Sequence, residues 1–274
     1  MILTAVIVTY NNYHGLIKVI KNLKGQSYPP SHIMIIDNNS IDETVNIKFL
    51  FPEIMYIRLV ENKGSAGGYS EGLRLAKDFS DFIFLSDDDT VYSSISLENL
   101  VKSINSLGEK VGAVRTAWKG YNSLVPEKVE SCGWSGVLIR ANVVKVIGLP
   151  REDYFLYYDD MEYWLRMKKY NYDFYIIPNT IYLKFFENHQ IKTTFFGKHT
   201  TIYKDEFRLY YAFRNGVYTS LIYKKITQLI RIILYAFKVI LILRDFRKTK
   251  TILEGISDGM ISRLGRNDKY VVKR

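Results

Sequence analysis

The chain has 274 residues, of which 47% are hydrophobic and 24% charged, a composition that is ordinary for a globular protein and excludes a disordered one. Its single cysteine, Cys132, excludes an intramolecular disulfide, and no cluster of cysteine and histidine has the spacing of a zinc site. The first ten residues contain a short apolar run with no basic segment before it, which predicts a strand rather than a signal peptide. We therefore expect a cytoplasmic protein.

The net charge of +10 is unevenly distributed. Residues 221–274 contain 13 Lys or Arg and 4 Asp or Glu, whereas residues 1–220 are close to neutral. A nearly neutral main body argues against a nucleic-acid partner, while a basic tail suits an anionic membrane or another polyanion.

The first hundred residues alternate apolar, β-rich runs with segments of helical periodicity. We expect strands at 3–9, 32–36, 54–59 and 82–85, and helices at 15–24, 42–51 and 68–79. Strands and helices that follow one another in this way predict a parallel sheet covered by helices on both faces.

The second half is less regular. We expect helices at 96–107 and 161–170, strands at 112–117, 136–140 and 174–177, and an irregular polar and aromatic stretch at 185–203. The predicted domains are an α/β domain at 1–220 and a basic helical region at 221–274.

The segment 226–243 is strongly apolar but contains Arg231 and Lys238, which makes it a poor membrane-spanning helix. Lys224, Arg231 and Lys238 recur every seven residues, which places the cations on one stripe of a helix. We predict that this helix lies in the interface of an anionic membrane; the alternative is a helix that packs in the core or forms a dimer.

Polar residues follow each of the first four predicted strands. These segments are 9–12, 37–40, 61–64 and 86–89. Ligands of open parallel sheets bind beyond the carboxyl ends of the strands, so we expect the four segments to line one crevice.

Asp87, Asp88 and Asp89 repel one another and have no cation nearby in the sequence, so a divalent ion such as Mg²⁺ or Mn²⁺ is the simplest compensation. In an extended turn the first and third side chains lie on the same side, so Asp87 and Asp89 either share the ion or divide between ribose and metal. A solvated acidic loop or a helix cap before Ser96 is the alternative.

Glycines at 64, 67 and 68 open a predicted helix, where they allow close backbone approach and where the helix N-terminus favours a phosphate. A turn without a ligand fits equally well. The glycine spacing excludes a P-loop and a dinucleotide-binding motif, which argues against a nucleotide kinase and a dehydrogenase.

Asp159 and Asp160 begin a predicted helix after the aromatic run at 154–158. Helix capping is one interpretation. The other is that a carboxylate here accepts a proton from a hydroxyl group of a substrate.

Taken in order, these motifs resemble family-2 glycosyltransferases of the GT-A type over about residues 3–215. They are Thr-Tyr-Asn-Asn, Asp-Asn-Asn-Ser, Asn-x-Gly-x-Ala-Gly-Gly, Asp-Asp-Asp and Phe-x-x-x-Asp-Asp-x-Glu-Tyr-x-x-Arg. Within the family the chain looks most like bacterial galactofuranosyl- and rhamnosyltransferases. The implied fold is α/β, with a GT-A-like nucleotide-binding half on a mostly parallel sheet, a mixed acceptor half and C-terminal basic amphipathic helices.

The resemblance also implies roles for individual residues. Asp160 becomes the catalytic base, and Asp87 and Asp89 meet the ribose and a Mn²⁺ or Mg²⁺ ion. The implied substrate-binding residues are Thr9 and Asp37 at the uridine-type base, Asn62, Gly67 and Gly68 beside the donor, Trp134 near the acceptor, and Asp88 and Asp159. Trp134 fits a core position equally well, and 210–215 matches a late element of the family.

One position departs from the family pattern. Lys184 stands where members often place a metal-binding histidine after a strand. Either a histidine of the following loop, His189 or His199, supplies the third metal ligand, or Lys184 contacts phosphate directly. We choose His189 as the candidate ligand.

The resemblance implies an inverting transferase that moves a sugar from a UDP-type nucleotide sugar to a glycan acceptor in bacterial surface polysaccharide synthesis. Galactofuranose is the favoured sugar, and dTDP-rhamnose is the alternative donor. We expect a lipid-linked acceptor and a peripheral location on the inner face of the cell membrane. The alternative of another class is a sugar-nucleotide-binding scaffold without catalysis.

Overall fold

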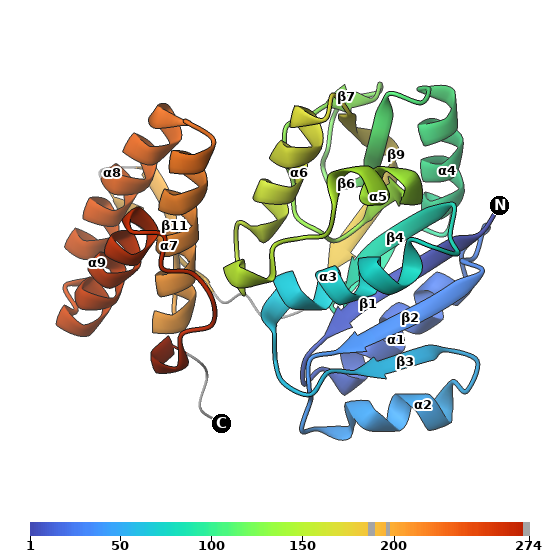
Figure 1. The fold of residues 1–274 in the computed structure, drawn as a ribbon, viewed down its shortest axis with the longest axis horizontal. Coiled ribbons are helices and arrows are strands. Elements are labelled where there is room, and N and C mark those ends of the chain that lie inside the picture. Colours follow the sequence, from blue (N-terminus) through green and yellow to red (C-terminus); the bar gives the residue numbers. More distant parts are fainter. Residues whose placement is uncertain (186–189, 196–197, 271–274) are drawn as a thin grey trace. The chain divides into compact units, whose positions relative to one another are not determined.

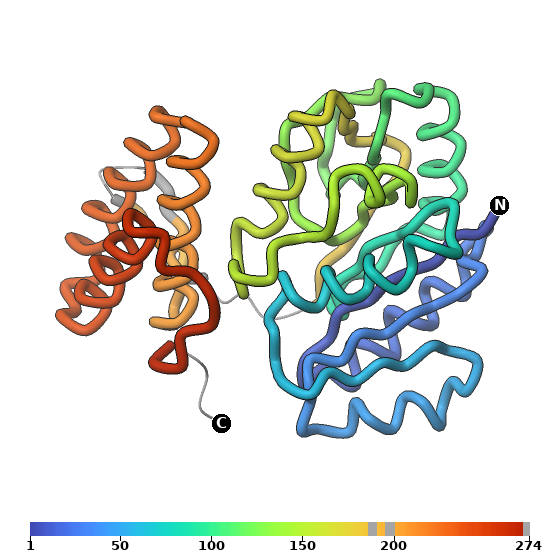
Figure 2. The backbone as a smooth tube through the Cα atoms, in the orientation of Figure 1, coloured from blue at the N-terminus to red at the C-terminus, as the bar shows by residue number. Residues whose placement is uncertain are grey.

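The computed structural model describes residues 1–185, 190–195 and 198–270 (Figures 1 and 2). The chain divides into two compact units. The sheet unit comprises Met1–Arg151 and Asp160–Phe186, and the helical unit comprises Glu152–Asp159 and Glu187–Arg274. The predicted boundary after residue 220 falls inside the helical unit, because α7 (Glu206–Ile222) packs against the helices that follow it.

The described strands of the sheet unit form one mixed sheet in the order β3-β2-β1-β4-β8-β6-β9-β5, with β7 beside β9. Their bounds are β1 Leu3–Thr9, β2 His32–Asp37, β3 Met55–Arg58, β4 Phe82–Asp87, β5 Thr90–Tyr92, β6 Val111–Trp118, β7 Glu127–Lys128, β8 Val137–Arg140 and β9 Asp173–Lys184. The first four strands are parallel, as predicted. β8 runs antiparallel to both β4 and β6, which makes the second half mixed.

Helices cover both faces of this sheet. Their bounds are α1 Tyr13–Lys24, α2 Ile47–Leu50, α3 Gly64–Ala76, α4 Ser96–Ser106, α5 Ala141–Ile147 and α6 Asp159–Lys169. α1 and α4 belong to one core, whereas α3, α5 and α6 belong to the other. Successive residues of β1 alternate between the two cores, because neighbouring side chains of a strand point to opposite faces: Ala5 and Ile7 join the first core and Val6 the second. The predicted α/β fold with a doubly covered sheet is confirmed.

The helical unit contains α7, α8 (Ile226–Leu243), α9 (Phe246–Met260) and a hairpin of β10 (Gln190–Phe195) with β11 (Lys198–Tyr203). The prediction of an irregular stretch at 185–203 was wrong for this hairpin. Its strands are rich in polar residues, but Ile202 is buried against Leu209 and Phe213 of α7, and a ribbon with one packed face needs few apolar side chains.

Two glycines let α3 approach β1 closely. A Cβ atom at Gly68 would lie 2.5 Å from Val8 Cγ1, and one at Gly72 would lie 2.3 Å from Val6 Cγ1. Neither separation is possible without movement of the helix or the strand, so this helix–sheet contact requires both glycines.

We expect Gly68→Ala to lower the free energy of unfolding by about 1–3 kcal/mol, because the added methyl group overpacks the contact between α3 and β1. Denaturant unfolding followed by circular dichroism measures the loss. Gly133→Ala is the control, because a Cβ there would come no closer than 3.8 Å to the nearest atom, Asp160 Oδ2. Equal unfolding midpoints for the two variants would contradict the packing argument.

Candidate functional site

The candidate site lies where the strand order of the parallel half reverses. From β1 the chain adds β2 and β3 on one side and then returns to place β4 on the other. Such a switch point opens a crevice beyond the carboxyl ends of the two central strands. Thr9 ends β1 and Asp87 ends β4, and the pairing of Val8 with Asp87 brings these two ends together.

Asp88 ties the ends of the two strands together. Its Oδ2 accepts hydrogen bonds from Thr9 Oγ1 at 2.6 Å and from the backbone N–H of Tyr10 at 3.4 Å, and its backbone oxygen accepts one from Asn12 Nδ2 at 3.0 Å. Burial raises the pKa of Asp88 to about 7, against the opposing effect of the hydrogen bonds from Thr9 and Asn12. Two predicted substrate residues, Thr9 and Asp88, are therefore bonded to each other.

Asp37 is fully buried and fixes the turn that follows β2. Its Oδ1 accepts hydrogen bonds from the backbone N–H and the hydroxyl of Ser40, and its Oδ2 accepts one from the Tyr56 hydroxyl at 2.5 Å. Both carboxylate oxygens thus have partners within the protein, and contact with a base stays a prediction.

The predicted donor residues at the start of α3 are held by local bonds. Asn62 Oδ1 accepts a hydrogen bond from the Gly64 N–H at 2.8 Å, and Asn38 Nδ2 donates to the Gly64 oxygen at 3.1 Å. A Cβ at Gly67 would lie 2.3 Å from Lys63 Cβ. Close packing accounts for Gly67 and Gly68 without a ligand, so their contact with a donor stays a prediction.

Asp87 and Asp89 lie together and share a cation of the chain itself. Lys184 Nζ lies 2.7 Å from Asp87 Oδ2 and 3.4 Å from Asp89 Oδ1. Burial opposes ionisation of Asp87, but Lys184 and a hydrogen bond from Tyr69 outweigh it and lower the pKa of Asp87. Burial and the neighbouring Asp87 raise the pKa of Asp89. Burial also opposes the charge of Lys184, yet the two aspartates raise the pKa of its ammonium.

This arrangement does not fit the predicted metal. The ammonium of Lys184 is within ion-pair distance of both Asp87 and Asp89. His189 lies outside the described residues. The side chain of His199 likewise lies outside what the structure describes. Among the described side chains, no three His, Cys, Asp or Glu are grouped so that they could hold a metal ion.

Trp134 lies in an aromatic cluster and is only 5% exposed. Its ring stacks on Tyr69, with centroids 4.9 Å apart, and also contacts Tyr163 and Trp164. The hydroxyl of Tyr69 donates to Asp87 Oδ1 at 2.7 Å, so the cluster supports the acidic turn. This packing supports the core interpretation of Trp134, and its contact with an acceptor stays a prediction. Sequence reasoning missed Tyr69, because nothing in its spacing links it to Asp87.

Asp160 begins the part of α6 that belongs to the sheet unit, where its Oδ1 accepts a hydrogen bond from the Met161 N–H at 2.6 Å. A Cβ at Gly133 would lie 3.8 Å from Asp160 Oδ2, and Ser135 Oγ accepts a hydrogen bond from the Asp87 N–H at 3.2 Å. The segment 133–135 therefore borders Asp160 and the acidic turn. The preceding residue, Asp159, is 2% exposed.

The aromatic run before Asp160 has a backbone that is unfavourable for its residues. Phe155, Tyr157 and Tyr158 have φ values of 64°, 66° and 62°, in the left-handed region that bulky side chains rarely adopt. Each such residue costs about 1–3 kcal/mol and persists only where surrounding contacts impose it.

Two buried side chains of α7 impose this conformation. Asn215 Nδ2 donates to the backbone oxygens of Tyr154, Leu156 and Tyr157 at 2.8–2.9 Å, and Arg214 Nη2 donates to that of Tyr154 at 2.9 Å. The late motif at 210–215 thus holds the segment that leads into Asp159 and Asp160. Sequence reasoning had recognised the motif but not this role.

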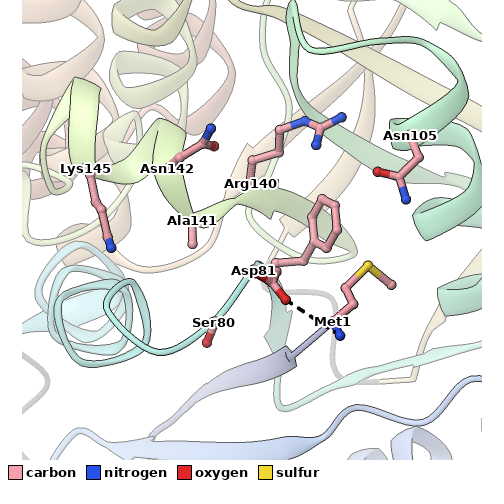
Figure 3. Close-up of a pocket in the computed structure, with 9 residues that line it drawn as sticks. Met1, Ser80, Asp81, Asn105, Arg140, Ala141, Asn142 and Lys145 are labelled. Carbon is pink, nitrogen blue, oxygen red and sulfur yellow. Dashed lines mark ion pairs between the residues drawn. The ribbon is translucent and has the colours of Figure 1, made fainter.

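The cavity shown in Figure 3 lies at the opposite edge of the sheet, by the amino ends of β1 and β4. It measures about 650 Å³ and is lined by residues that include Met1, Asp81, Arg140 and Lys145. The guanidinium of Arg140 donates to the backbone oxygens of Ile104 and Val111, so it serves the fold. The cavity is separate from the acidic turn.

Comparison with known proteins identifies the domain that carries this site. Residues 4–137, which include β1 to β4 and the acidic turn, match the family described as Glycosyl transferase family 2. This part of the chain is therefore similar to family-2 glycosyltransferases. The uncharacterized glycosyltransferase YwdF of Bacillus subtilis (strain 168) is 32% identical over 108 residues, which are 39% of this chain and 39% of YwdF. The chain therefore matches about two fifths of the length of this curated relative.

Solved structures show that the fold is GT-A-like. S. aureus TarS 1-349 in complex with UDP-GlcNAc has a TM-score of 0.65 at 15% identity, with 95% of this chain and 81% of that one covered. GalNAc-T7 with UDP, GalNAc and Mn²⁺ has a TM-score of 0.64 at 13% identity, with 82% and 49% covered.

We expect Thr9→Val to lower the free energy of unfolding by about 1–3 kcal/mol, because Asp88 loses its shortest hydrogen bond while the side-chain volume is kept. Thr4→Val at the other end of β1 is the control. It removes a neutral hydrogen bond to Ser80, for which about 1 kcal/mol is expected. Denaturant titrations at neutral pH measure both losses, and a smaller loss for Thr9→Val would refute the anchoring role of Asp88.

Proposed function

We propose that this glycosyltransferase transfers a sugar from a UDP-type nucleotide sugar to a hydroxyl group of a glycan acceptor. The observation that carries the proposal is the placement of two carboxylate groups along one segment: the acidic turn after β4 and Asp160 both border residues 133–135. The neighbours support the choice of donor, since TarS was solved with UDP-GlcNAc and GalNAc-T7 with UDP and GalNAc.

Asp160 and the acidic turn lie where a single displacement reaction needs an acceptor site and a donor site. Asp160 is only partly buried and takes the proton of the acceptor hydroxyl as that oxygen attacks the anomeric carbon, which inverts its configuration. The nucleoside diphosphate departs toward the crevice between β1 and β4. Both carboxylate oxygens of Asp37 and Oδ2 of Asp88 are bonded within the protein, so these groups shape the crevice walls.

No step of this proposal uses the predicted Mn²⁺ or Mg²⁺. GalNAc-T7 was solved with Mn²⁺ together with UDP, and that neighbour supports divalent-metal use in proteins of this fold. In the present chain, two of the three expected ligands, Asp87 and Asp89, are paired with Lys184.

The proposed sugar is galactofuranose, which rests on the resemblance of the Asp-Asp-Asp turn to galactofuranosyltransferases. Transfer from dTDP-rhamnose is the alternative. Incubation of the protein with each donor and a lipid-linked glycan acceptor, followed by mass spectrometry of the product, separates the two. A protein that binds UDP but transfers no sugar from either of these donors, or from UDP-GlcNAc and UDP-GalNAc, would be the non-catalytic scaffold.

We expect Asp160→Asn to slow transfer about 10²- to 10⁴-fold, because the amide cannot accept the acceptor proton. UDP affinity should stay within about twofold of the wild type, since the acidic turn is unchanged. Initial rates and calorimetric titration measure the two quantities. Asp78→Asn, a change of a carboxylate that is 67% exposed at the surface, is the control and should leave both unchanged. A near-normal rate for Asp160→Asn would remove this residue from the mechanism.

The helical unit carries the proposed membrane surface on α8. Its buried side chains, Ile232, Ala236 and Val239, belong to the core that also includes residues of α7 and α9. A second apolar stripe is exposed and recurs at helical spacing: Ile226, Ile230, Leu234, Phe237 and Leu241. The helix is long and apolar enough to cross a membrane, and 17% of it is buried.

Two features support a helix that lies in the interface rather than one that spans the bilayer. One face of α8 is packed within the helical unit, so lipid cannot surround it. The predicted stripe of three cations was wrong for Lys224, which precedes α8 and has a left-handed backbone. At 100° per residue, Arg231 and Lys238 fall between the exposed stripe and the packed face, where they reach anionic headgroups while Phe237 and its neighbours enter the acyl boundary. We place the enzyme on the inner face of the cell membrane, in the cytoplasm, with a lipid-linked acceptor.

We expect Phe237→Glu to weaken binding to phosphatidylglycerol-containing vesicles by about tenfold or more, because it places a charge in the apolar stripe. Folding should be unaffected, since the side chain of Phe237 is 64% exposed. Leu124→Glu is the matched control, because Leu124 is 90% exposed in the sheet unit. Vesicle sedimentation measures the bound fraction, and equal binding of both variants and the wild type would contradict the surface on α8.

A further inference from the structure

The pairing of β5 with β9 builds Lys184 into the acidic turn. Thr90 directly follows Asp89 and lies opposite Lys184 in the antiparallel ladder, and the N–H of Phe185 donates to the backbone oxygen of Asp89 at 3.0 Å. The residues next to the ion pair are thus tied across the two strands, Lys184 opposite Thr90 and Phe185 to Asp89. Strand pairing therefore fixes Lys184 beside the acidic turn.

A second cation lies behind the turn. Arg115 on β6 is 8% exposed, and its Nη2 donates to the backbone oxygen of Ser135 at 3.4 Å. Its guanidinium also lies over the ring of Tyr182, 5.3 Å from the centroid, while its Nε has no hydrogen-bond partner among the described residues. Ser135 accepts the hydrogen bond of the Asp87 N–H, so Arg115 is one residue removed from the acidic turn. The chain thereby supplies positive charge to its own carboxylates from two strands.

A divalent ion shared by Asp87 and Asp89 would meet the ammonium of Lys184. The ammonium is 2.7 Å from one carboxylate and 3.4 Å from the other, so an ion that bridged the same oxygens would lie a few ångströms from a like charge. Binding of the ion therefore requires displacement of Lys184. A nucleoside diphosphate instead requires Lys184 to stay in place, because the negative charge of its phosphates is attracted to the ammonium.

We propose that the ammonium of Lys184 takes the place of a divalent cation in this site: it neutralises Asp87 and Asp89 and holds the diphosphate of the donor. This inference rests on the proposed use of a UDP-type donor. The side chain of Lys184 is 48% exposed, so its ammonium reaches a diphosphate in the crevice without leaving the turn. Its three N–H donors serve both aspartates and a phosphate oxygen at once. UDP binding by this chain consequently needs no divalent metal.

Calorimetric titration of the full-length chain with UDP tests the proposal, first in excess EDTA and then in millimolar Mn²⁺. The dissociation constants of the wild type should agree within about twofold. Lys184→Met should weaken binding by about tenfold or more in EDTA, whereas Lys184→Arg should keep most of the affinity. Lys102→Met is the matched control, because Lys102 is paired with Glu98 on the surface of α4. The electron paramagnetic resonance signal of free Mn²⁺, recorded with wild type and UDP and compared with UDP alone, reports whether the metal enters the site.

The outcomes separate this proposal from the function on which it rests. UDP binding that appears only with Mn²⁺, together with loss of the free-Mn²⁺ signal, would overturn the role of Lys184 and leave the UDP-type donor in place. Unchanged affinity of a folded Lys184→Met variant in EDTA would overturn it equally. Absence of UDP binding in both buffers would overturn the proposed donor, and this inference with it. If Lys184→Met does not fold, the wild-type affinities for UDP in EDTA and in Mn²⁺, together with the affinity of Lys184→Arg, still test the proposal.

Discussion

The parallel pairing of β1 with β4 is the constraint on which the rest of the site depends. It brings the ends of two strands, 79 residues apart in sequence, close enough for Thr9 to bond to Asp88. Once these strands are adjacent, the turn after β4 lies beside the end of β1, and the short strand that follows the turn, β5, pairs with β9. The acidic turn, its hydrogen bonds and its cation all follow from this strand order.

The second constraint on the site is the compensation of its negative charges. Most carboxylates in the crevice already have partners in the protein: Asp37 has Ser40 and Tyr56, Asp88 has Thr9, and Asp87 has Tyr69 and Lys184. Buried or half-buried charges without such partners carry a large desolvation penalty. The crevice is therefore preorganised before any ligand enters, and its chemistry is set as much by the partners as by the aspartates.

Much of the fold and part of the site could be predicted from the sequence. Strands buried on both faces read as continuous apolar runs, so β1 was placed at its observed bounds, and the acidic turn stood out because polar residues follow such a run. The hairpin of β10 and β11 has no such run and was missed. Long-range partners were also invisible: Lys184 meets Asp87 across 97 residues, and Tyr69 offers no pattern that points to a carboxylate.

The left-handed backbone at Phe155, Tyr157 and Tyr158 has a consequence for how the protein is made. That segment is held by Arg214 and Asn215, and Gly265 in turn accepts a hydrogen bond from Arg214 and donates one to the Asp153 oxygen. Synthesis on the ribosome proceeds from the N-terminus, so the early strands can pair while the chain is still short. The residues before Asp160 gain their full set of restraints only after Gly265 has emerged. A nascent chain with a finished sheet thus still lacks part of the contacts that hold the segment leading into the proposed catalytic base.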